Sequence, residues 1–203
     1  MRYDQDAKQK TRERVLLEAS KVMRHEGAQA VGVASVMARA GMTHGGFYAH
    51  FRSKNELLAE TVELMIQQIR ARYARITGDL PAADALRAYV TFYLSPQHRD
   101  NPVSTCPMPV LSADAARLGG AAQAIYSRGL DALLAEMARH LRAAGVGDPD
   151  AVASSVAAEL VGAMSLARAV GNPAQSDLIL ARSRHNVLDR LGLGDGAVAP
   201  QGH

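Results

Sequence analysis

A run of residues near the N-terminus combines hydroxyl, imidazole, phenol and ammonium groups with two adjacent glycines. Its members are Thr43, His44, Gly45, Gly46, Tyr48, Ala49, His50 and Lys54. Such side chains, together with free backbone N–H groups at the start of a helix, are the groups with which proteins hold phosphate oxygens. The chemistry that this run predicts is the binding of a polyanion, with no bond made or broken.

Three successive helices are predicted to position these groups. Apolar residues at helical spacing indicate helices over 6–26 and 33–40, and Thr43 is the natural N-cap of a third helix over 43–51. Short helices in this order form a helix-turn-helix, in which the third helix enters the major groove of double-stranded DNA. Within that helix, we expect Phe47 and Phe51 to belong to the core.

Few side chains on the third helix are available to read bases. His44 can donate to a guanine edge and Ala49 can contact a thymine methyl group. Gly45 and Gly46 should each cost an α-helix about 1 kcal/mol relative to alanine. We therefore expect this helix to be loose in the free protein and to become firm on DNA, with specificity depending on DNA shape and half-site spacing.

Charge is distributed unevenly along the chain. Residues 1–54 contain ten lysines and arginines and five aspartates and glutamates, whereas residues 55–203 contain thirteen and fifteen. A basic head on a slightly acidic body suits a phosphate partner, although an ordinary solvated surface would look the same. The flanking cations that either reach phosphates or are simply solvated are Arg2, Lys8, Lys10, Arg12 and Arg14.

The remaining sequence predicts an all-α body. Alanine and leucine dominate, strand patterns are missing, and the whole chain is expected to form about nine helices. Ser53 and Glu56 form a capping box at the start of a helix that reaches about residue 76. Residues 95–106 are predicted to be a polar connection. We expect a DNA-binding domain over 1–54 and an effector-binding and dimerisation domain over 55–203.

Several classes of function are disfavoured. The sequence carries no phosphate-binding loop, metal-ligand spacing or nucleophile motif, so we expect no catalytic residue, no metal, no cofactor and no enzymatic activity. No apolar run approaches the ~20 residues that cross a bilayer, and the N-terminus lacks a signal peptide. We expect a cytoplasmic protein without a membrane partner.

Three segments resemble the TetR/AcrR family of bacterial transcriptional regulators: 11–16 (TRERVL), 40–43 (AGMT) and 47–54 (FYAHFRSK). The resemblance implies phosphate contacts by Tyr48, His50 and Lys54. It also implies a homodimer through the last two long helices, about 150–170 and 174–191, and a small-molecule effector that releases a palindromic operator, as in a repressor. Gly32 and Met37 depart from the family, which often has Ser or Thr and a small residue at those positions.

Two features of the body are candidates for sensing the effector. Cys106 precedes Pro107, and if it is the N-cap of the next helix, the helix dipole and His98 or Arg99 would favour a reactive thiolate. In that case, electrophiles or oxidants act on Cys106. The alternative is a structural Cys106 and an effector held non-covalently in an apolar pocket. Candidate pocket residues, besides Tyr73, are Tyr89, Phe92, Tyr93, Met108, Tyr126 and Met137.

Overall fold

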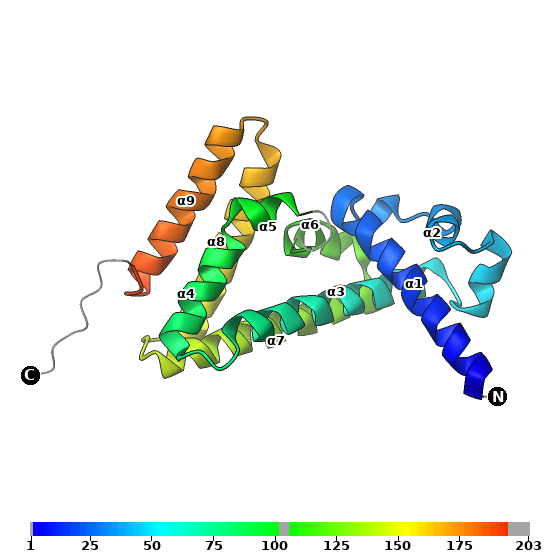
Figure 1. Ribbon diagram of the computed structural model, residues 1–203, viewed down its shortest axis with the longest axis horizontal. Coiled ribbons are helices and arrows are strands. Elements are labelled where there is room, and N and C mark those ends of the chain that lie inside the picture. The colour runs from blue at the N-terminus through cyan, green and yellow to red at the C-terminus, as the bar shows by residue number, and fades with distance from the viewer. Residues whose placement is uncertain (1, 102–105, 195–203) are drawn as a thin grey trace, which may run out of the picture. The chain divides into compact units, whose positions relative to one another are not determined.

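The computed structural model describes residues 2–101 and 106–194, with side chains from Asp6 onward. These residues form nine α-helices and two short 3₁₀ helices, without a strand among them (Figure 1). The α-helices are α1 (Arg2–Glu26), α2 (Val33–Arg39), α3 (Lys54–Thr77), α4 (Ala82–Tyr93), α5 (Pro96–Asp100), α6 (Met108–Leu118), α7 (Gly120–Ala143), α8 (Pro149–Ala169) and α9 (Pro173–Arg190). The 3₁₀ helices are η1 (Ala28–Ala30) and η2 (His44–Ala49). The predicted all-helical class is confirmed.

The described residues fall into two compact units. Unit 1 contains the chain up to Arg70 and the described part of 102–130, and unit 2 contains 71–101 and the described part of 131–203. The predicted boundary between residues 54 and 55 falls inside unit 1, so an independent head of 54 residues stays a prediction.

The core of the head forms where the periodicity predicted it. Val15, Ala19 and Met23 of α1 are fully buried, as are Val36 and Met37 of α2. Burial of a large apolar side chain of this kind contributes about 1.5–3 kcal/mol to stability. Met37, which departs from the family pattern, is therefore accommodated as a core residue.

The third element of the head differs from its prediction. Residues 44–49 form the 3₁₀ helix η2, not an α-helix over 43–51. The reason is local, because two adjacent glycines penalise the α-helix and a segment this short gains few hydrogen bonds from it. Thr43 is the N-cap as predicted, but its side chain makes no capping hydrogen bond.

The start of α3 follows the predicted capping box in part. The Glu56 backbone N–H donates to Ser53 Oγ at 3.1 Å. The Glu56 carboxylate accepts from the Arg52 N–H, one residue before the position that the capping box predicts. Together these contacts fix the turn that joins η2 to α3.

The segment predicted as a polar connection contains α5. Ser95 Oγ accepts from the His98 N–H at 3.1 Å, and Pro96 occupies the first helical position. A Ser–Pro pair is a helix-start signal, so the prediction of a connection over 95–106 was wrong for residues 96–100. Residues 102–105 lie outside the described residues.

In unit 2, α8 and α9 lie side by side and are joined by a short turn (Figure 1). Asn172 caps α9, accepting from the Gln175 N–H at 3.2 Å. Arg190 and Glu159 form a 3.0 Å ion pair between the two helices. The predicted long helices at 150–170 and 174–191 therefore form a packed helical hairpin.

By length and composition alone, α8 is apolar enough to span a membrane, which corrects the expectation that no apolar run comes close. The most apolar stretch of this helix is 33% buried, and Val156, Leu160 and Met164 are buried within unit 2. A helix that packs one face in a core meets the same criterion.

Candidate DNA-binding surface

Two phenylalanines hold η2 on the head. Phe47 and Phe51 are each 1% exposed, and their rings stack with centroids 5.5 Å apart. Phe47 also meets the Tyr48 ring edge-on at 5.3 Å. Their predicted core role is confirmed, and it fixes the face that η2 turns outward.

The residues predicted to meet DNA surround η2 on that outer side. Tyr48 is 73% exposed. Thr43, His44, Gly45, Ala49 and Lys54 are also exposed, whereas Gly46 and His50 are partly buried. The structure thus brings the eight predicted residues to one stretch of surface, and their contacts with DNA stay a prediction.

Neither glycine of η2 is required by the backbone or by its neighbours. A Cβ atom at Gly45 would meet nothing within 4 Å, and one at Gly46 would lie at ordinary contact distance, 3.8 Å, from Met37 Cε. Neither residue has a positive φ angle. The free protein would therefore accept alanine at both positions, so packing does not explain the glycines.

His50 is a neutral contact candidate. Its Nδ1 atom is buried and has no hydrogen-bond partner among the described residues. Burial lowers the pKa of His50, and the nearby charges of Lys8 and Arg12 lower it further. His50 is therefore uncharged near pH 7 in the free protein.

The flanking cations of α1 divide into two groups. Lys8, Lys10 and Arg14 are exposed and available to phosphates. Arg12 is engaged inside unit 1: its guanidinium pairs with both carboxylate oxygens of Glu60, and its Nε donates to the His50 carbonyl at 3.2 Å. Arg2 lies outside the described side chains.

A second internal contact joins the head to α6. The Ala28 N–H donates to the Asp114 carboxylate at 2.8 Å, next to Gly27, whose φ of +86° ends α1 as predicted. A Cβ at Gly27 would lie 3.0 Å from the same carboxylate. Sequence reasoning missed Asp114, because the two partners are 86 residues apart and neither belongs to a motif.

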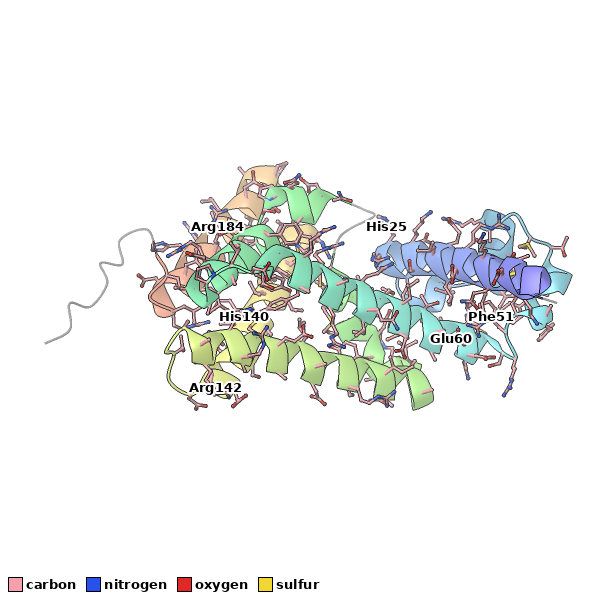
Figure 2. The ribbon with its side chains drawn as sticks, turned by 60° about the horizontal axis from the view of Figure 1, so that its bottom comes forward. His25, Phe51, Glu60, His140, Arg142 and Arg184 are labelled. Carbon is pink, nitrogen blue, oxygen red and sulfur yellow. The ribbon has the colours of Figure 1, made fainter. Side chains whose placement is uncertain are left out.

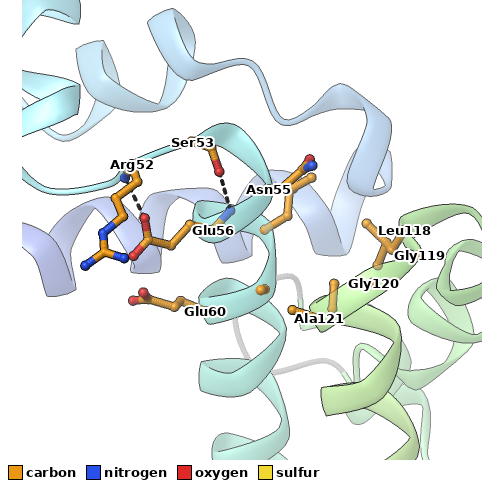
Figure 3. A pocket seen from close by; sticks show the side chains of 12 residues that line it. Arg52, Ser53, Asn55, Glu56, Glu60, Leu118, Gly119, Gly120 and Ala121 are labelled. Atoms are coloured by element: carbon orange, nitrogen blue, oxygen red, sulfur yellow. Dashed lines mark hydrogen bonds between the residues drawn. The ribbon is translucent and has the colours of Figure 1, made fainter.

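A cleft of about 610 Å³ lies within unit 1 between the start of α3 and the junction of α6 with α7 (Figure 3). Arg52, Ser53 and Asn55 line one wall, and Gly119 and Gly120 line the other. No sequence motif predicts this cleft, because the two segments that line it are far apart in the chain.

Cys106 does not occupy the predicted position. The N-cap of α6 is Pro107, and Cys106 is 4% exposed. His98, proposed to supply positive charge, lies in unit 2, where burial lowers its pKa to about 4 and leaves it neutral near pH 7. Arg99 pairs with Asp100 and Asp177. The arguments for a helix-cap thiolate therefore fail, whereas the reactivity of Cys106 stays a prediction.

The candidate effector residues divide between the two units. Tyr89, Phe92, Tyr93 and Met137 belong to unit 2, whereas Met108 and Tyr126 belong to unit 1. Tyr89 packs edge-on against Tyr73 at 4.6 Å, and Tyr126 lies 2.8 Å from Ser112 Oγ. None of the six lines the cleft at α3 or a smaller one of about 280 Å³ beside Arg99 and Ser176.

In unit 2 the aromatic residues surround buried polar groups. The Tyr73 hydroxyl lies 2.9 Å from His140 Nδ1, and burial raises the pKa of Tyr73. His98 Nδ1 donates to the Tyr93 carbonyl at 2.8 Å. The described residues hold no cluster of three or more His, Cys, Asp or Glu side chains that could bind a metal.

A packed three-element head, with its third element turned outward, defines a helix-turn-helix DNA-binding protein. Residues 15–61 match the family described as "Bacterial regulatory proteins, tetR family". This match covers the head and the first turns of α3, so residues 15–61 form a DNA-binding domain of the tetR family.

Solved structures share the fold over nearly the whole chain. A TetR regulator from Chloroflexus aurantiacus J-10-FL has a TM-score of 0.80 and 21% identity, with 93% of this chain and 98% of that one covered. NemR of E. coli in its reduced form has a TM-score of 0.78 and 21% identity, with 89% and 96% covered. A regulator from Agrobacterium tumefaciens has a TM-score of 0.76 and 21% identity, with 88% and 98% covered. No curated protein sequence matches the chain significantly.

Proposed function

We propose that this protein is a repressor that binds a palindromic operator as a homodimer and is released by a small-molecule effector acting on residues 55–203. The observation that carries the proposal is the exposed surface of η2, with Tyr48 73% exposed beside Thr43, His44 and Lys54. Two such surfaces related by a two-fold axis match two half-sites. Its place of action is then the cytoplasm, where the operator is found.

The proposed dimer interface is the outer side of the α8–α9 hairpin. Along α8, Ser154, Ala158, Gly162 and Leu166 recur every four residues and therefore share one face. Leu166 is 60% exposed, and a Cβ at Gly162 would meet nothing within 4 Å. Leu178 of α9 is 51% exposed. Small and apolar residues exposed together favour close packing against a second copy.

Two modes of release are open to the effector. Burial of Cys106 at 4% exposure favours non-covalent binding with a structural cysteine, because a buried thiol reacts slowly. A covalent mode would require the chain around Cys106 to open first. The E. coli structure with the same fold is described as a reduced form, so oxidants belong among the effectors to be tested.

DNA binding is tested on a labelled duplex spanning the promoter upstream of this protein's own gene, with a random duplex of equal length as control. We expect the promoter duplex to be bound at least 10³-fold more tightly, as for specific regulators. In a reporter strain, deletion of the gene should raise expression from that promoter. Equal affinity for the two duplexes would contradict the proposal.

The dimer is tested by sedimentation of the Leu166→Glu variant. We expect a monomer with much weaker operator binding, since a buried, unpaired carboxylate disfavours association. Leu80→Glu is the matched control, because Leu80 is similarly exposed, at 45%, but lies outside the hairpin. A dimeric Leu166→Glu protein would place the interface elsewhere.

The mode of release is tested with Cys106→Ser. Operator complexes of both proteins are treated with hypochlorite, with an α,β-unsaturated aldehyde and with apolar metabolites. Release of the wild-type protein alone by the first two reagents would support a sensing thiol. Equal release of both proteins by a metabolite would support the non-covalent alternative.

A further inference from the structure

Arg12 connects three elements of unit 1. It lies on α1, its Nε donates to the carbonyl of His50 at the end of η2, and its two Nη atoms pair with Glu60 on α3. Figure 2 shows Phe51 and Glu60 beside α1. One side chain therefore joins the first helix, the recognition element and the helix that leaves the head.

The geometry uses the whole guanidinium group. Glu60 is held by the two-pronged pairing that only arginine offers, and Glu56 Oε1 lies 3.6 Å from Arg12 Nη2. The guanidinium carbon lies 4.6 Å from the centre of the Phe51 ring. In Figure 3, the Glu56 and Glu60 side chains point to the same side of α3, where Arg12 meets them.

Glu56 extends this arrangement to the next turn of chain. Its carboxylate accepts from the Arg52 N–H, while its own N–H donates to Ser53 Oγ. The backbone from His50 to Glu56 is thus held at its first residue by Arg12 and at its later residues by Glu56. Two predicted phosphate contacts, His50 and Lys54, lie in this segment.

We propose that Arg12 is a positioning residue for DNA binding: it sets His50 and Lys54 at the spacing that the phosphates require and does not itself contact DNA. The inference rests on the DNA-binding surface of the proposed function. It departs from the reading that the basic charge of α1 would suggest, in which Arg12 is one more phosphate contact.

The engagement of Arg12 supports this role. To reach a phosphate, its guanidinium would have to leave two carboxylates and a backbone carbonyl, and Glu56 and Glu60 would keep negative charge close to the DNA. The side chain of Arg12 is only 24% exposed, whereas Lys8, Lys10 and Arg14 are exposed residues without a carboxylate partner among the described ion pairs. Positioning therefore preserves contacts that a phosphate contact would break.

The salt dependence of binding separates the two roles. The plot of log K against log salt concentration has a negative slope, and each phosphate contact that is lost makes this slope less steep by about 0.9. We compare the wild type, Arg12→Lys and Arg12→Met/Glu60→Gln, since the last two keep the net charge of the cluster. We expect both variants to bind the promoter duplex roughly tenfold more weakly with an unchanged slope.

Arg24→Gln is the matched structural control. Arg24 also joins α1 to α3, through Gln68, and it lies about three helical turns further along α1 than Arg12. We expect this variant to unfold at a lower temperature and to keep the affinity of the wild type for DNA. A loss of affinity equal to that of Arg12→Lys would show that general weakening of the α1–α3 interface, not positioning, is responsible.

Hydrogen exchange without DNA completes the test. We expect faster exchange at the amides of residues 50–56 in Arg12→Lys and unchanged exchange in α2. Wild-type affinity in Arg12→Lys, or a slope less steep by about 0.9 in Arg12→Met/Glu60→Gln, would overturn the proposal. If the wild type binds both duplexes equally, operator specificity fails instead, and the same variants on the random duplex still decide the role of Arg12.

Discussion

The surface around η2 and the aromatic cluster of unit 2 use polar side chains in opposite ways. Around η2, Tyr48 and His44 extend into solvent from an element that Phe47 and Phe51 anchor. In unit 2, Tyr73 and His98 are buried and bonded to neighbours within the unit. The exposed groups around η2 stay hydrated, so they change the free energy of folding little and are available for binding. The buried groups of unit 2 contribute to stability only while each hydrogen bond is kept.

The largest effect should come from acidifying unit 2. The pKa of His98 is about 4 in the folded protein and near 6.5 in the unfolded chain, so the unfolded chain binds more protons between these values. Stability is therefore lost as the pH falls from 6.5 towards 4, by up to roughly 3 kcal/mol.

Urea unfolding at a series of pH values measures this loss. His98→Gln should remove it, so that the stability difference between variant and wild type shrinks as the pH falls. If the difference in the free energy of unfolding between the wild type and His98→Gln stays constant with pH, His98 is charged or accessible in the folded protein.

Removing one hydroxyl from the DNA-binding surface should act on affinity alone. Tyr48→Phe keeps the ring contact with Phe47 and removes only the phenol hydroxyl of a residue that is 73% exposed. A hydrogen bond to a phosphate contributes about 1.5–3 kcal/mol, so operator binding should weaken about tenfold or more while the melting temperature is unchanged. Fluorescence anisotropy checks this, with Tyr126→Phe as the control. Unchanged affinity would remove Tyr48 from the contacts.

The same deletion in unit 2 should act on stability alone. Tyr73→Phe removes the hydroxyl that lies 2.9 Å from His140 Nδ1, at a cost of about 1 kcal/mol. His140 keeps a second neighbour, the Glu136 carbonyl at 3.1 Å, which limits the loss. Calorimetry should show the lower stability, and the folded variant should bind DNA like the wild type. Weaker DNA binding by folded Tyr73→Phe would mean that the two regions are coupled.

The smallest effect should come from the glycines of η2. Alanine at Gly45 or Gly46 should stabilise the element by about 0.5–1 kcal/mol. Only Gly45→Ala should weaken operator binding, because position 45 is exposed whereas a side chain at 46 would face Met37 and Met42. Hydrogen exchange of residues 43–50 should slow on DNA in the wild type. Equal protection with and without DNA would contradict a loose recognition element.

Two kinds of feature could be predicted from the sequence: contacts between residues close together in the chain, and the residues expected to meet DNA. The core stripe of α1, the Ser53 cap and the two buried phenylalanines follow from spacing within a few residues. The residues expected at phosphates could be named because helix-turn-helix proteins meet the same polyanion in the same orientation.

Contacts between distant segments could not be found in this way. Arg12 and Glu60 are 48 residues apart, and a basic residue on α1 looks equally suited to phosphate. The six candidate effector residues share only their apolar character, which is also what a core requires, and the structure divides them between two units. The space left for an effector depends on how distant segments pack, and the spacing of residues within one segment does not predict that packing.

The contact between Asp114 and the Ala28 N–H bears on how modular this protein is. The predicted domain boundary suggests that a chimera could be made by joining this head to another body at residue 54. In this chain such a cut would leave the Ala28 N–H without its acceptor, and it would also separate Arg12 from Glu60. The smallest portable part is therefore larger than the motif: a functional transplant should carry the first turns of α3 and a compatible acidic residue on α6.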